Sequence, residues 1–239
     1  MGIVGAVFNV IISFCIPLGV LGYLLIRKRS YLKYFLFGIC GFTISQILIR
    51  IPLLSLVQGT DAYLAFGALY PLLIIFLLAL SAGLFEEPAR FLFLRHTSKR
   101  DADLNIPLFY GLGHAGVEAI VFVGLQNLVL LFTQQSLLLT LNVEVFLAGF
   151  ERISAFMLHI ALSLIIYYGI MKAKKRYLLL AIAFHTLMNC TLILAQLGVS
   201  LLVFELVLFS LALIFLLSSV LLVRKAFRGD SQSVRLIYP

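Results

Sequence analysis

The sequence predicts an all-α, polytopic membrane protein with about seven transmembrane helices. Of its 239 residues, 63% are apolar, and the mean hydropathy is +1.14. Only 12% are charged, against about 25% in an average soluble domain. A water-soluble fold of this length would not bury so much apolar surface, because a single core covers only part of it. The same composition excludes disordered, collagen-like and disulfide-rich secreted proteins.

Each predicted helix is an apolar stretch long enough to cross a bilayer. A hydrocarbon core about 30 Å thick requires roughly 20 residues of helix. In chain order, the stretches that qualify are 3–26, 34–57, 64–94, 106–132, 148–171, 177–197 and 200–223. No linker is long or polar enough to separate two domains. We therefore expect one integral membrane domain over 1–223 and a basic cytoplasmic tail over 224–239.

The basic residues predict the orientation of these helices. Fifteen of the 18 follow the first, third, fifth and seventh stretches: Arg27, Lys28, Arg29, Lys33, Arg95, Lys99, Arg100, Lys172, Lys174, Lys175, Arg176, Arg224, Lys225, Arg228 and Arg235. The opposite loops, 58–63, 133–147 and 198–199, contain no Lys or Arg. The positive-inside rule places the N-terminus outside and the C-terminus in the cytoplasm. The net charge of +8 then faces anionic lipid, and no nucleic-acid partner is expected.

Ionisable residues inside the apolar stretches are the unusual feature of this chain. They are Arg50, Glu86, Glu87, Arg90, His114, Glu118, Glu151, Arg152, His159, His185 and Glu205. A charge at the centre of a membrane helix costs about 2.5–3.5 kcal/mol by insertion scales, so each one needs a partner or a task. The four charged residues nearest the outer side, Arg50, Glu151, Arg152 and Glu205, balance one another, and we expect them to be mainly structural partners.

The remaining polar residues fall at similar depths on different helices. Counted from the cytoplasmic boundaries, a first layer at roughly 12–13 Å contains Glu86, His114 and His185. A second layer at roughly 18–20 Å contains Glu118, His159 and Asn189. Four helices therefore bring polar groups to one slab in the cytoplasmic half, which we take as the candidate site.

Helical periodicity groups these residues further. Arg90 lies four residues after Glu86 and three after Glu87, so it can pair with one glutamate and leave the other available. Tyr110, His114 and Glu118 recur every four residues along one face, as do His185 and Asn189. Glycines beside His114 permit close helix approach; these are Gly111, Gly113 and Gly116.

Several types of hydrolase can be tested against the slab by the motifs that the sequence lacks. The sequence has no His-Glu-x-x-His zinc motif and no Gly-x-Ser-Gly element, and its aspartates lie in loops or the tail. A glutamate that acts as general base on water, next to histidines, remains possible. Asn189 and a histidine are suited to stabilise a developing oxyanion.

The motifs resemble those of the CAAX-protease and bacteriocin-processing superfamily. They are Glu86-Glu87-Pro-Ala-Arg90, Tyr110-x-x-x-His114 and His185-x-x-x-Asn189. The stretch from Gly113 to Glu118, with Glu151, Arg152 and His159, is more specifically similar to the YhfC-type intramembrane metalloproteases. The resemblance implies a peptidase of the bacterial plasma membrane whose site is reached from the cytoplasmic leaflet.

The resemblance also implies roles for the residues of the slab. Glu86 or Glu87 would activate water together with His114, while Arg90 would position the glutamates. His185 and Asn189 would bind the oxyanion or orient the water, with Tyr110, Glu118 and His159 in support. The sequence departs from the CAAX-processing pattern, since two residues rather than three separate Glu87 from Arg90 and Tyr110 replaces phenylalanine.

Several alternatives remain open at this point. His114, His159, His185 and Glu118 would be the ligands of a zinc ion if one is bound, but no ligand spacing demands a metal. A transporter would also place ionisable residues in membrane helices. A b-type haem protein would use His114 and His185 as axial ligands. A non-catalytic binding or immunity protein on the same fold would carry the same motifs. The substrate and the oligomeric state are not defined by the sequence.

Overall fold

The fold is built from helices throughout residues 1–97, 103–141 and 144–235, which are the parts that this computed structural model describes; the side chains of Thr97 and 226–235 are not described. The elements, in order, are α1 (Gly2–Arg27), η1 (Arg29–Tyr31), α2 (Leu32–Phe42), η2 (Thr43–Arg50), α3 (Ile51–Gln58), α4 (Asp61–Leu69), α5 (Pro71–Thr97), α6 (Asn105–Ala119), η3 (Ile120–Gly124), α7 (Leu125–Thr133), α8 (Gln135–Thr140), α9 (Val145–Met171), α10 (Arg176–Cys190), α11 (Leu192–Gln196) and α12 (Leu201–Arg235).

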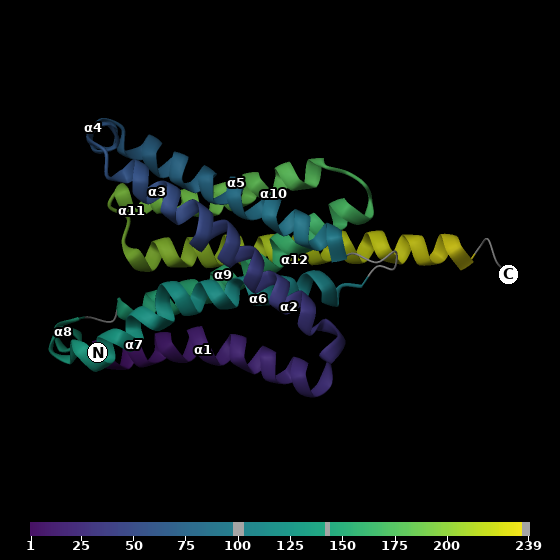
Figure 1. The fold of residues 1–239 in the computed structure, drawn as a ribbon, viewed down its shortest axis with the longest axis horizontal. Coiled ribbons are helices and arrows are strands. Elements are labelled where there is room, and N and C mark those ends of the chain that lie inside the picture. Colours follow the sequence, from purple (N-terminus) through teal and green to yellow (C-terminus); the bar gives the residue numbers. More distant parts are fainter. Residues whose placement is uncertain (98–102, 142–143, 236–239) are drawn as a thin grey trace.

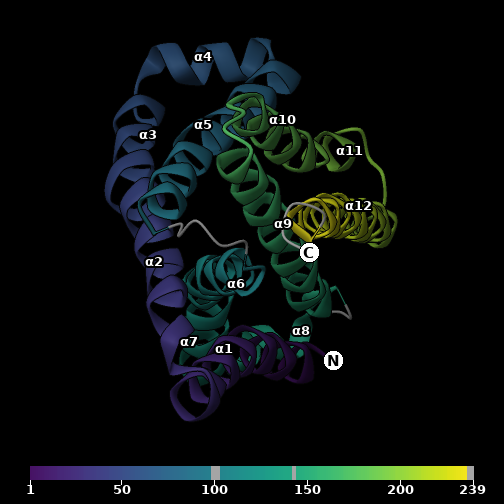
Figure 2. The ribbon, with the colours of Figure 1, turned by 90° about the vertical axis from the view of Figure 1, so that its right-hand side faces the viewer.

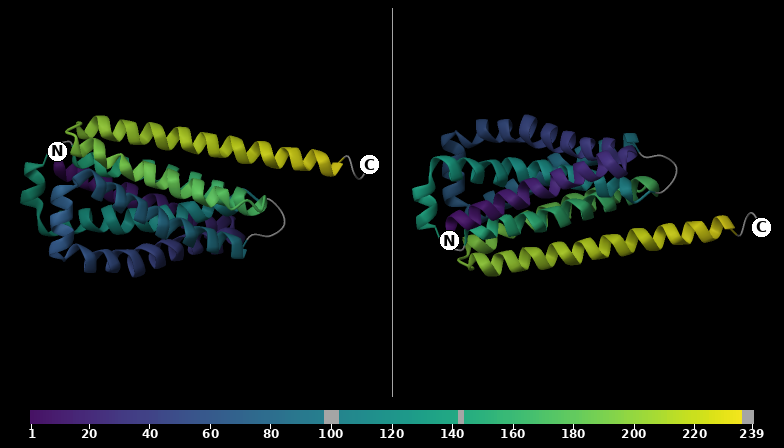
Figure 3. Two further views of the ribbon diagram at one scale, coloured as in Figure 1. Left: turned by 90° about the horizontal axis from the view of Figure 1, so that it is seen from above. Right: turned by 90° about the horizontal axis from the view of Figure 1, so that it is seen from below.

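Seven helical segments of the described chain are long and apolar enough to cross a membrane, which confirms the predicted fold class. They are Gly2–Arg27, Arg29–Gln58, Pro71–His96, Asn105–Thr133, Val145–Met171, Arg176–Gln196 and Leu201–Lys225. Two contain a π-helical stretch, η2 in the second and η3 in the fourth. The long helices run side by side along the longest axis of the molecule (Figures 1 and 3).

The third span begins later than predicted. The stretch expected over 64–94 is divided, because α4 forms a separate short helix that crosses the end of the bundle before α5 begins (Figure 2). Tyr70 has φ −131° and ψ 61°, outside the helical region. The following Pro71 explains this break, since a proline disfavours helical backbone at the residue before it. Thr60 caps the start of α4 by accepting a hydrogen bond from the Tyr63 N–H at 3.3 Å.

Helix α9 lies at the centre of the bundle (Figure 2). Buried residues make up 67% of its most apolar 18-residue window, against 22–33% in the other six spans. It packs against α1, α5, α6, α10 and α12. Its polar residues Arg152, Ser154, His159 and Ser163 are all buried, so α9 presents polar groups to the helices packed around it.

Two close helix crossings position α6 against its neighbours, as the glycines predicted. A Cβ atom on Gly113 would lie 2.8 Å from the carbonyl carbon of Phe35, and one on Gly38 would lie 2.7 Å from the backbone nitrogen of His114. A Cβ on Gly111 would lie 2.8 Å from the carbonyl oxygen of His159. Small residues allow backbones in membranes to approach this closely. The crossings hold His114 between α2 and α9.

Apart from Arg50, Arg90 and Arg152, which lie inside the bundle, the described basic residues gather at one end, near the start of α2, the end of α5 and the turn between α9 and α10. Lys99 and Arg100 lie outside the described residues, as do the side chains of Arg228 and Arg235. Helix α12 continues from Leu201 to Arg235 and extends well beyond the other helices at this end (Figure 3). The predicted tail over 224–239 therefore begins inside a helix.

Candidate active site

The structure brings together polar side chains from α5, α6, α9 and α10 in the middle of the bundle. Six of them are almost completely buried, with exposed fractions of 0–4%: Glu86, Glu87, Arg90, His114, His159 and His185. Buried ionisable groups need partners, because removing a charge from water is costly unless it is paired and hydrogen-bonded. The arrangement of these partners differs for each of the two neighbouring glutamates.

Glu87 is held by an arginine and a histidine. Its Oε2 lies 2.9 Å from Arg90 Nε, and its Oε1 accepts a hydrogen bond from Arg90 Nη2 at 3.3 Å. Oε1 also lies 2.7 Å from His185 Nδ1. An ionised carboxylate only accepts hydrogen bonds, so His185 carries a proton on Nδ1. A neutral His185 therefore keeps its Nε2 lone pair free, the arrangement in which carboxylates orient histidines that serve as ligands or acceptors.

Arg90 connects α5 to the central helix. Its Nη1 donates to the carbonyl oxygen of His159 at 3.1 Å and to Ser163 Oγ at 2.7 Å. Its Nη2 lies 2.9 Å from His159 Nδ1. A guanidinium can only donate, so His159 Nδ1 accepts, and a neutral His159 carries its proton on Nε2. Arg90 thus determines the tautomer of His159 as well as the position of Glu87.

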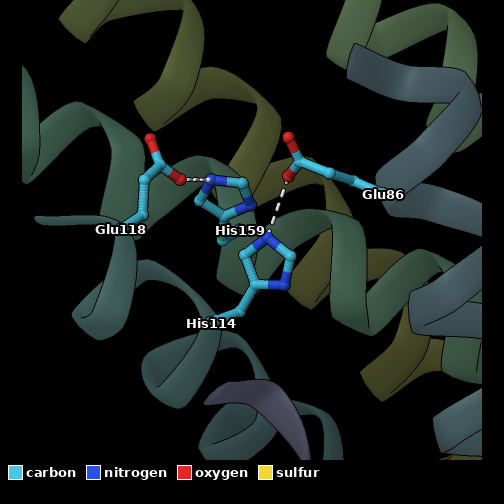
Figure 4. Close-up of side chains that lie close together, drawn as sticks. All are labelled: Glu86, His114, Glu118 and His159. Atoms are coloured by element: carbon cyan, nitrogen blue, oxygen red, sulfur yellow. Dashed lines mark hydrogen bonds and ion pairs between the residues drawn. The ribbon is translucent and has the colours of Figure 1, made fainter. Parts of the chain in front are cut away.

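Glu86 has surroundings unlike those of its neighbour. Its Oε2 lies 2.8 Å from His114 Nε2 (Figure 4), and its Oε1 lies 3.8 Å from His185 Nε2. Gln46 on η2 donates its side-chain N–H to the same Oε1. No lysine or arginine lies within ion-pair distance of Glu86 among the described residues. Glu86 is therefore flanked by two imidazoles and an amide, and its charge is not neutralised by a fixed cation.

Glu118 forms a second centre on the opposite side of His159. Its Oε2 lies 2.6 Å from His159 Nε2 (Figure 4), so the tautomer of His159 donates this hydrogen bond. Its Oε1 accepts from Arg152 Nη1 at 2.8 Å. Arg152 also pairs with Glu151. Arg152 and Glu151 are thus structural partners, as predicted, and they are joined to the site through Glu118.

A cavity of about 160 Å³ adjoins these residues. Its lining includes Gln46, Arg50, Glu86, Glu118, Glu151, Ser154, His159, His185 and Asn189. Side-chain exposure rises from 5% at Glu86 to 15% at Glu118 and 31% at Glu151. The cavity therefore extends from Glu86 toward the end of the bundle that is opposite the basic loops. Glu87, Arg90 and Tyr110 are not part of its lining.

Asn189 and Tyr110 occupy different positions relative to this cavity. Asn189 is half-buried on its wall, one helical turn beyond His185. Tyr110 lies behind the site, with its ring centroid 5.6 Å from the Arg90 guanidinium carbon and 6.2 Å from the His114 ring. Its hydroxyl group is buried and has no hydrogen-bond partner among the described residues. Tyr110 thus packs against the site without reaching the cavity.

On the side of the basic loops, the site is covered by a layer of packed apolar side chains. They are Tyr34, Phe35, Leu94, Ile106, Phe109, Tyr110, Leu162, Ile166 and Tyr167, all buried. A transport route would have to pass through this layer, which weakens the transporter alternative. The resemblance implied entry from the cytoplasmic leaflet, whereas the polar cavity extends toward the other end.

Gln46, Arg50 and Ser163 belong to the site region but were missed by the sequence reasoning as site residues. Gln46 bonds to Glu86, and it accepts a hydrogen bond from Arg50 Nη1 at 3.0 Å. The signal for this pair was present, because two polar residues four apart share a helix face in an otherwise apolar stretch. Nothing in the spacing of Ser163 distinguished it from a serine bonded only to its own helix.

Two groups of side chains could hold a metal ion. The donor atoms of Glu86, His114, Glu118 and His159 all lie within 4.8 Å of one another, and those of Glu86, Glu87 and His185 form a second group. The expected ligands His114, His159 and Glu118 share the first group, while His185 belongs to the second. Imidazole nitrogens and carboxylate oxygens are donors that zinc accepts. His159 fits least well, because its contact with Arg90 leaves the proton on the Nε2 atom that faces Glu118.

The chain is similar to known membrane proteins along most of its length. A family model described as "YhfC intramembrane metalloprotease" matches residues 12–138 and 123–211. The chain is 30% identical over 217 residues to "Uncharacterized membrane protein YhfC" of Bacillus subtilis (strain 168), and the match covers 79% of this chain and 83% of that protein. No solved structure matches the chain.

Proposed function

Because the chain belongs to the YhfC intramembrane metalloprotease family of multi-pass membrane proteins, we propose that it is an endopeptidase that hydrolyses a peptide bond of a membrane-associated protein or peptide. The observation that carries this proposal is the contrast between the two adjacent glutamates. Glu87 is bound by Arg90 and His185, while Glu86 faces the cavity beside His114. Only Glu86 is free to act on a molecule in the cavity.

In this proposal Glu86 is the general base. It takes a proton from a water molecule, the water oxygen forms a bond to the carbonyl carbon of the substrate, and the electron pair moves to the carbonyl oxygen. The C–N bond then breaks, and Glu86 returns the proton to the leaving amine. His114 Nε2, at 2.8 Å from Glu86, orients this carboxylate and balances its charge as the proton moves.

His185 and Asn189 have separate tasks in the same step. His185 donates Nδ1–H to Glu87, so its free Nε2 is suited to accept a hydrogen bond from the attacking water. The Asn189 amide donates to the developing oxyanion. Arg90 holds Glu87 and His159 and is a positioning residue. Glu118, His159 and Tyr110 support these groups and do not touch the reacting atoms.

The residues of the site also fit the metal that the family description implies. Glu86, His114 and Glu118 would hold a zinc ion, since carboxylate oxygens and imidazole nitrogens are donors that zinc accepts and one donor atom of each lies within 4.8 Å of the others. When bound, zinc supplies a Lewis acid that polarises water or the substrate carbonyl. Elemental analysis of purified protein tests this directly. Full activity after exhaustive chelation, in protein shown to contain no zinc, would remove the metal from the proposal.

The proposal is tested by comparing membrane peptides from cells that express the parent protein, Glu86→Gln or Glu144→Gln. Glu144 is an exposed glutamate at the start of α9, so Glu144→Gln makes the same chemical change away from the site. Fragments that appear with the parent and with Glu144→Gln, but not with Glu86→Gln, are the expected result. Removal of a general base lowers the rate by about 10²–10⁴-fold.

The same experiment distinguishes the enzyme from its alternatives. Fragments that persist with Glu86→Gln would exclude Glu86 as the base, and a parent protein that produces no fragments would support a non-catalytic protein on this fold.

A haem protein is disfavoured by geometry, because His114 and His185 face the two oxygens of one Glu86 carboxylate. The cavity of about 160 Å³ is also smaller than typical cofactor sites of about 300–1,000 Å³.

A further inference from the structure

Arg50 differs from Arg90 and Arg152, the other two arginines that lie away from the ends of the described spans. Arg90 and Arg152 each form an ion pair with a glutamate. Arg50 donates only to uncharged oxygens: Gln46 Oε1 at 3.0 Å, Ser81 Oγ at 2.9 Å and the Leu78 carbonyl at 2.8 Å. Among the described residues, no carboxylate lies within ion-pair distance of it. A cation without a direct ion pair inside a membrane helix is costly, so its retention indicates that it binds a further group.

The position of Arg50 connects this cation to the active-site cavity. Arg50 lines the cavity together with Glu86, His185 and Asn189. Gln46, one helical turn before Arg50, bonds to Glu86. The Gln46 amide bridges Glu86 and Arg50, and two hydrogen bonds of about 2.9 Å joined through one amide span roughly 6–8 Å. The other acceptors of Arg50, Ser81 and Leu78, precede Glu86 on α5, so the guanidinium lies toward the end of the bundle opposite the basic loops.

The hydrogen bonds of Arg50 leave part of its binding capacity unused. A guanidinium has five N–H groups, and three of them have protein acceptors here. Arg152, the arginine that contacts the acidic residues of the cavity, is already paired with Glu118 and Glu151. A carboxylate on a bound molecule would therefore form its ion pair with Arg50. The planar fork of arginine suits carboxylates in particular.

We propose that Arg50 is a specificity residue that binds a carboxylate of the substrate close to the scissile bond. This inference rests on the proposed peptidase function and names the chemical class of its substrate. Because an extended peptide advances about 3.3–3.6 Å per residue, the carboxylate lies about two residues from the scissile bond. It belongs to an acidic side chain or to a free C-terminal carboxyl group, on the side of the scissile bond that points away from the basic loops.

The first test determines the sequences around the cleavage sites. The termini of fragments produced by the parent protein are mapped in membrane-protein sequences. Aspartate, glutamate or a chain end should be enriched about two residues to one side of the cleaved bond. This measurement needs no variant of Arg50, so it does not depend on whether such a variant folds.

The second test uses synthetic peptides that span one mapped site, reconstituted with the purified protein in phospholipid vesicles. The peptides carry Glu, Gln or Lys at the position of the acidic residue, and each is made with a free and with an amidated C-terminus. For the parent, kcat/KM should fall about 10-fold or more from Glu to Gln, mainly through KM, because the half-buried Arg50 loses its charged partner. The amidated peptides distinguish a side-chain carboxylate from the C-terminal one.

Arg50→Gln should abolish the preference for the acidic peptide, and Arg50→Lys should retain part of it. The rival reading is that Arg50 acts only through Gln46 on Glu86. In that case Arg50→Gln would lower kcat equally for all peptides and leave their ratio unchanged, which would overturn our inference. If the parent cleaves the Glu, Gln and Lys peptides equally well, our inference about Arg50 would also be overturned. The proposed peptidase function would not be affected by that result. If the parent protein cleaves none of the peptides, the proposed peptidase function would be contradicted as well.

Discussion

The neighbouring residues Glu86 and Glu87 show how position on a helix assigns different tasks to the same side chain. Glu87 and Arg90 are both fully buried, and their charges compensate each other. Glu86 faces the cavity and depends on hydrogen bonds from His114 and Gln46. One glutamate therefore belongs to the scaffold and the other to the proposed chemistry.

This difference predicts opposite effects for the same substitution at the two positions. Glu87→Gln leaves Arg90 buried without its counter-charge, so we expect a loss of about 3–5 kcal/mol of stability. Glu86→Gln breaks no pair with a lysine or arginine, and should abolish activity with little change in stability. Thermal unfolding of both variants in detergent, beside the parent, measures the contrast. Equal unfolding midpoints for the two variants would contradict the assignment of Glu87 to the scaffold.

Helix α6 reaches its neighbours through glycine, and this contact places His114. Its ring lies 4.5 Å from the ring of His159 and 5.2 Å from that of Phe42, measured between centroids. Such proximity requires that the backbones of α2, α6 and α9 approach closely at Gly113 and Gly111. Helix α5 shows the opposite behaviour, because it continues from Pro71 to Thr97 despite the proline at position 88. Packing therefore overrides the local weakness that a proline introduces.

Gly113→Ala tests the contact between α2 and α6. The added Cβ would meet the backbone of Phe35, which cannot move aside as a side chain would. We expect a loss of about 1–3 kcal/mol, typical of overpacking, and reduced activity because His114 is displaced. Gly22→Ala is the matched control, since a Cβ there meets nothing within 4 Å. An unfolding midpoint for Gly113→Ala equal to that of Gly22→Ala would show that the contact is looser than described.

Taken whole, the molecule has two chemically different ends. The described basic residues other than Arg50, Arg90 and Arg152 gather at one end, next to the layer of buried aromatic and aliphatic side chains that covers the site. The cavity extends toward the other end, where the loops lack Lys and Arg. If the positive-inside rule holds for this chain, the cavity faces the outer leaflet.

Reporter fusions measure this orientation. A fluorescent protein that matures only in the cytoplasm should be active when fused to the C-terminus, and a phosphatase that is active only after export should be inactive there. The same phosphatase inserted in the loop at 59–60, between α3 and α4, should be active. The reverse pattern at both positions would contradict the predicted orientation, and with it the leaflet to which we assign the cavity.

Much of this architecture followed from properties that each segment carries independently of the others. Apolar length predicted seven spans, and the constant rise of a helix predicted that Glu86, His114 and His185 lie at one depth. The boundary of the third span was wrong, because a stretch of uniform apolar composition concealed the separate helix α4 before Pro71. The family resemblance was also visible in the motifs, and the match to the YhfC family confirms it.

The pairing of charges could not be obtained in the same way. Depth and spacing left both Glu86 and Glu87 available to Arg90, and they did not indicate that Gln46 and Arg50 reach the same cavity. Which side chains meet depends on the rotation of each helix about its axis and on how closely two backbones cross. Those quantities are determined by packing between segments far apart in the chain. Composition and periodicity thus define what the membrane requires of each helix, and tertiary packing selects the carboxylate that is left free.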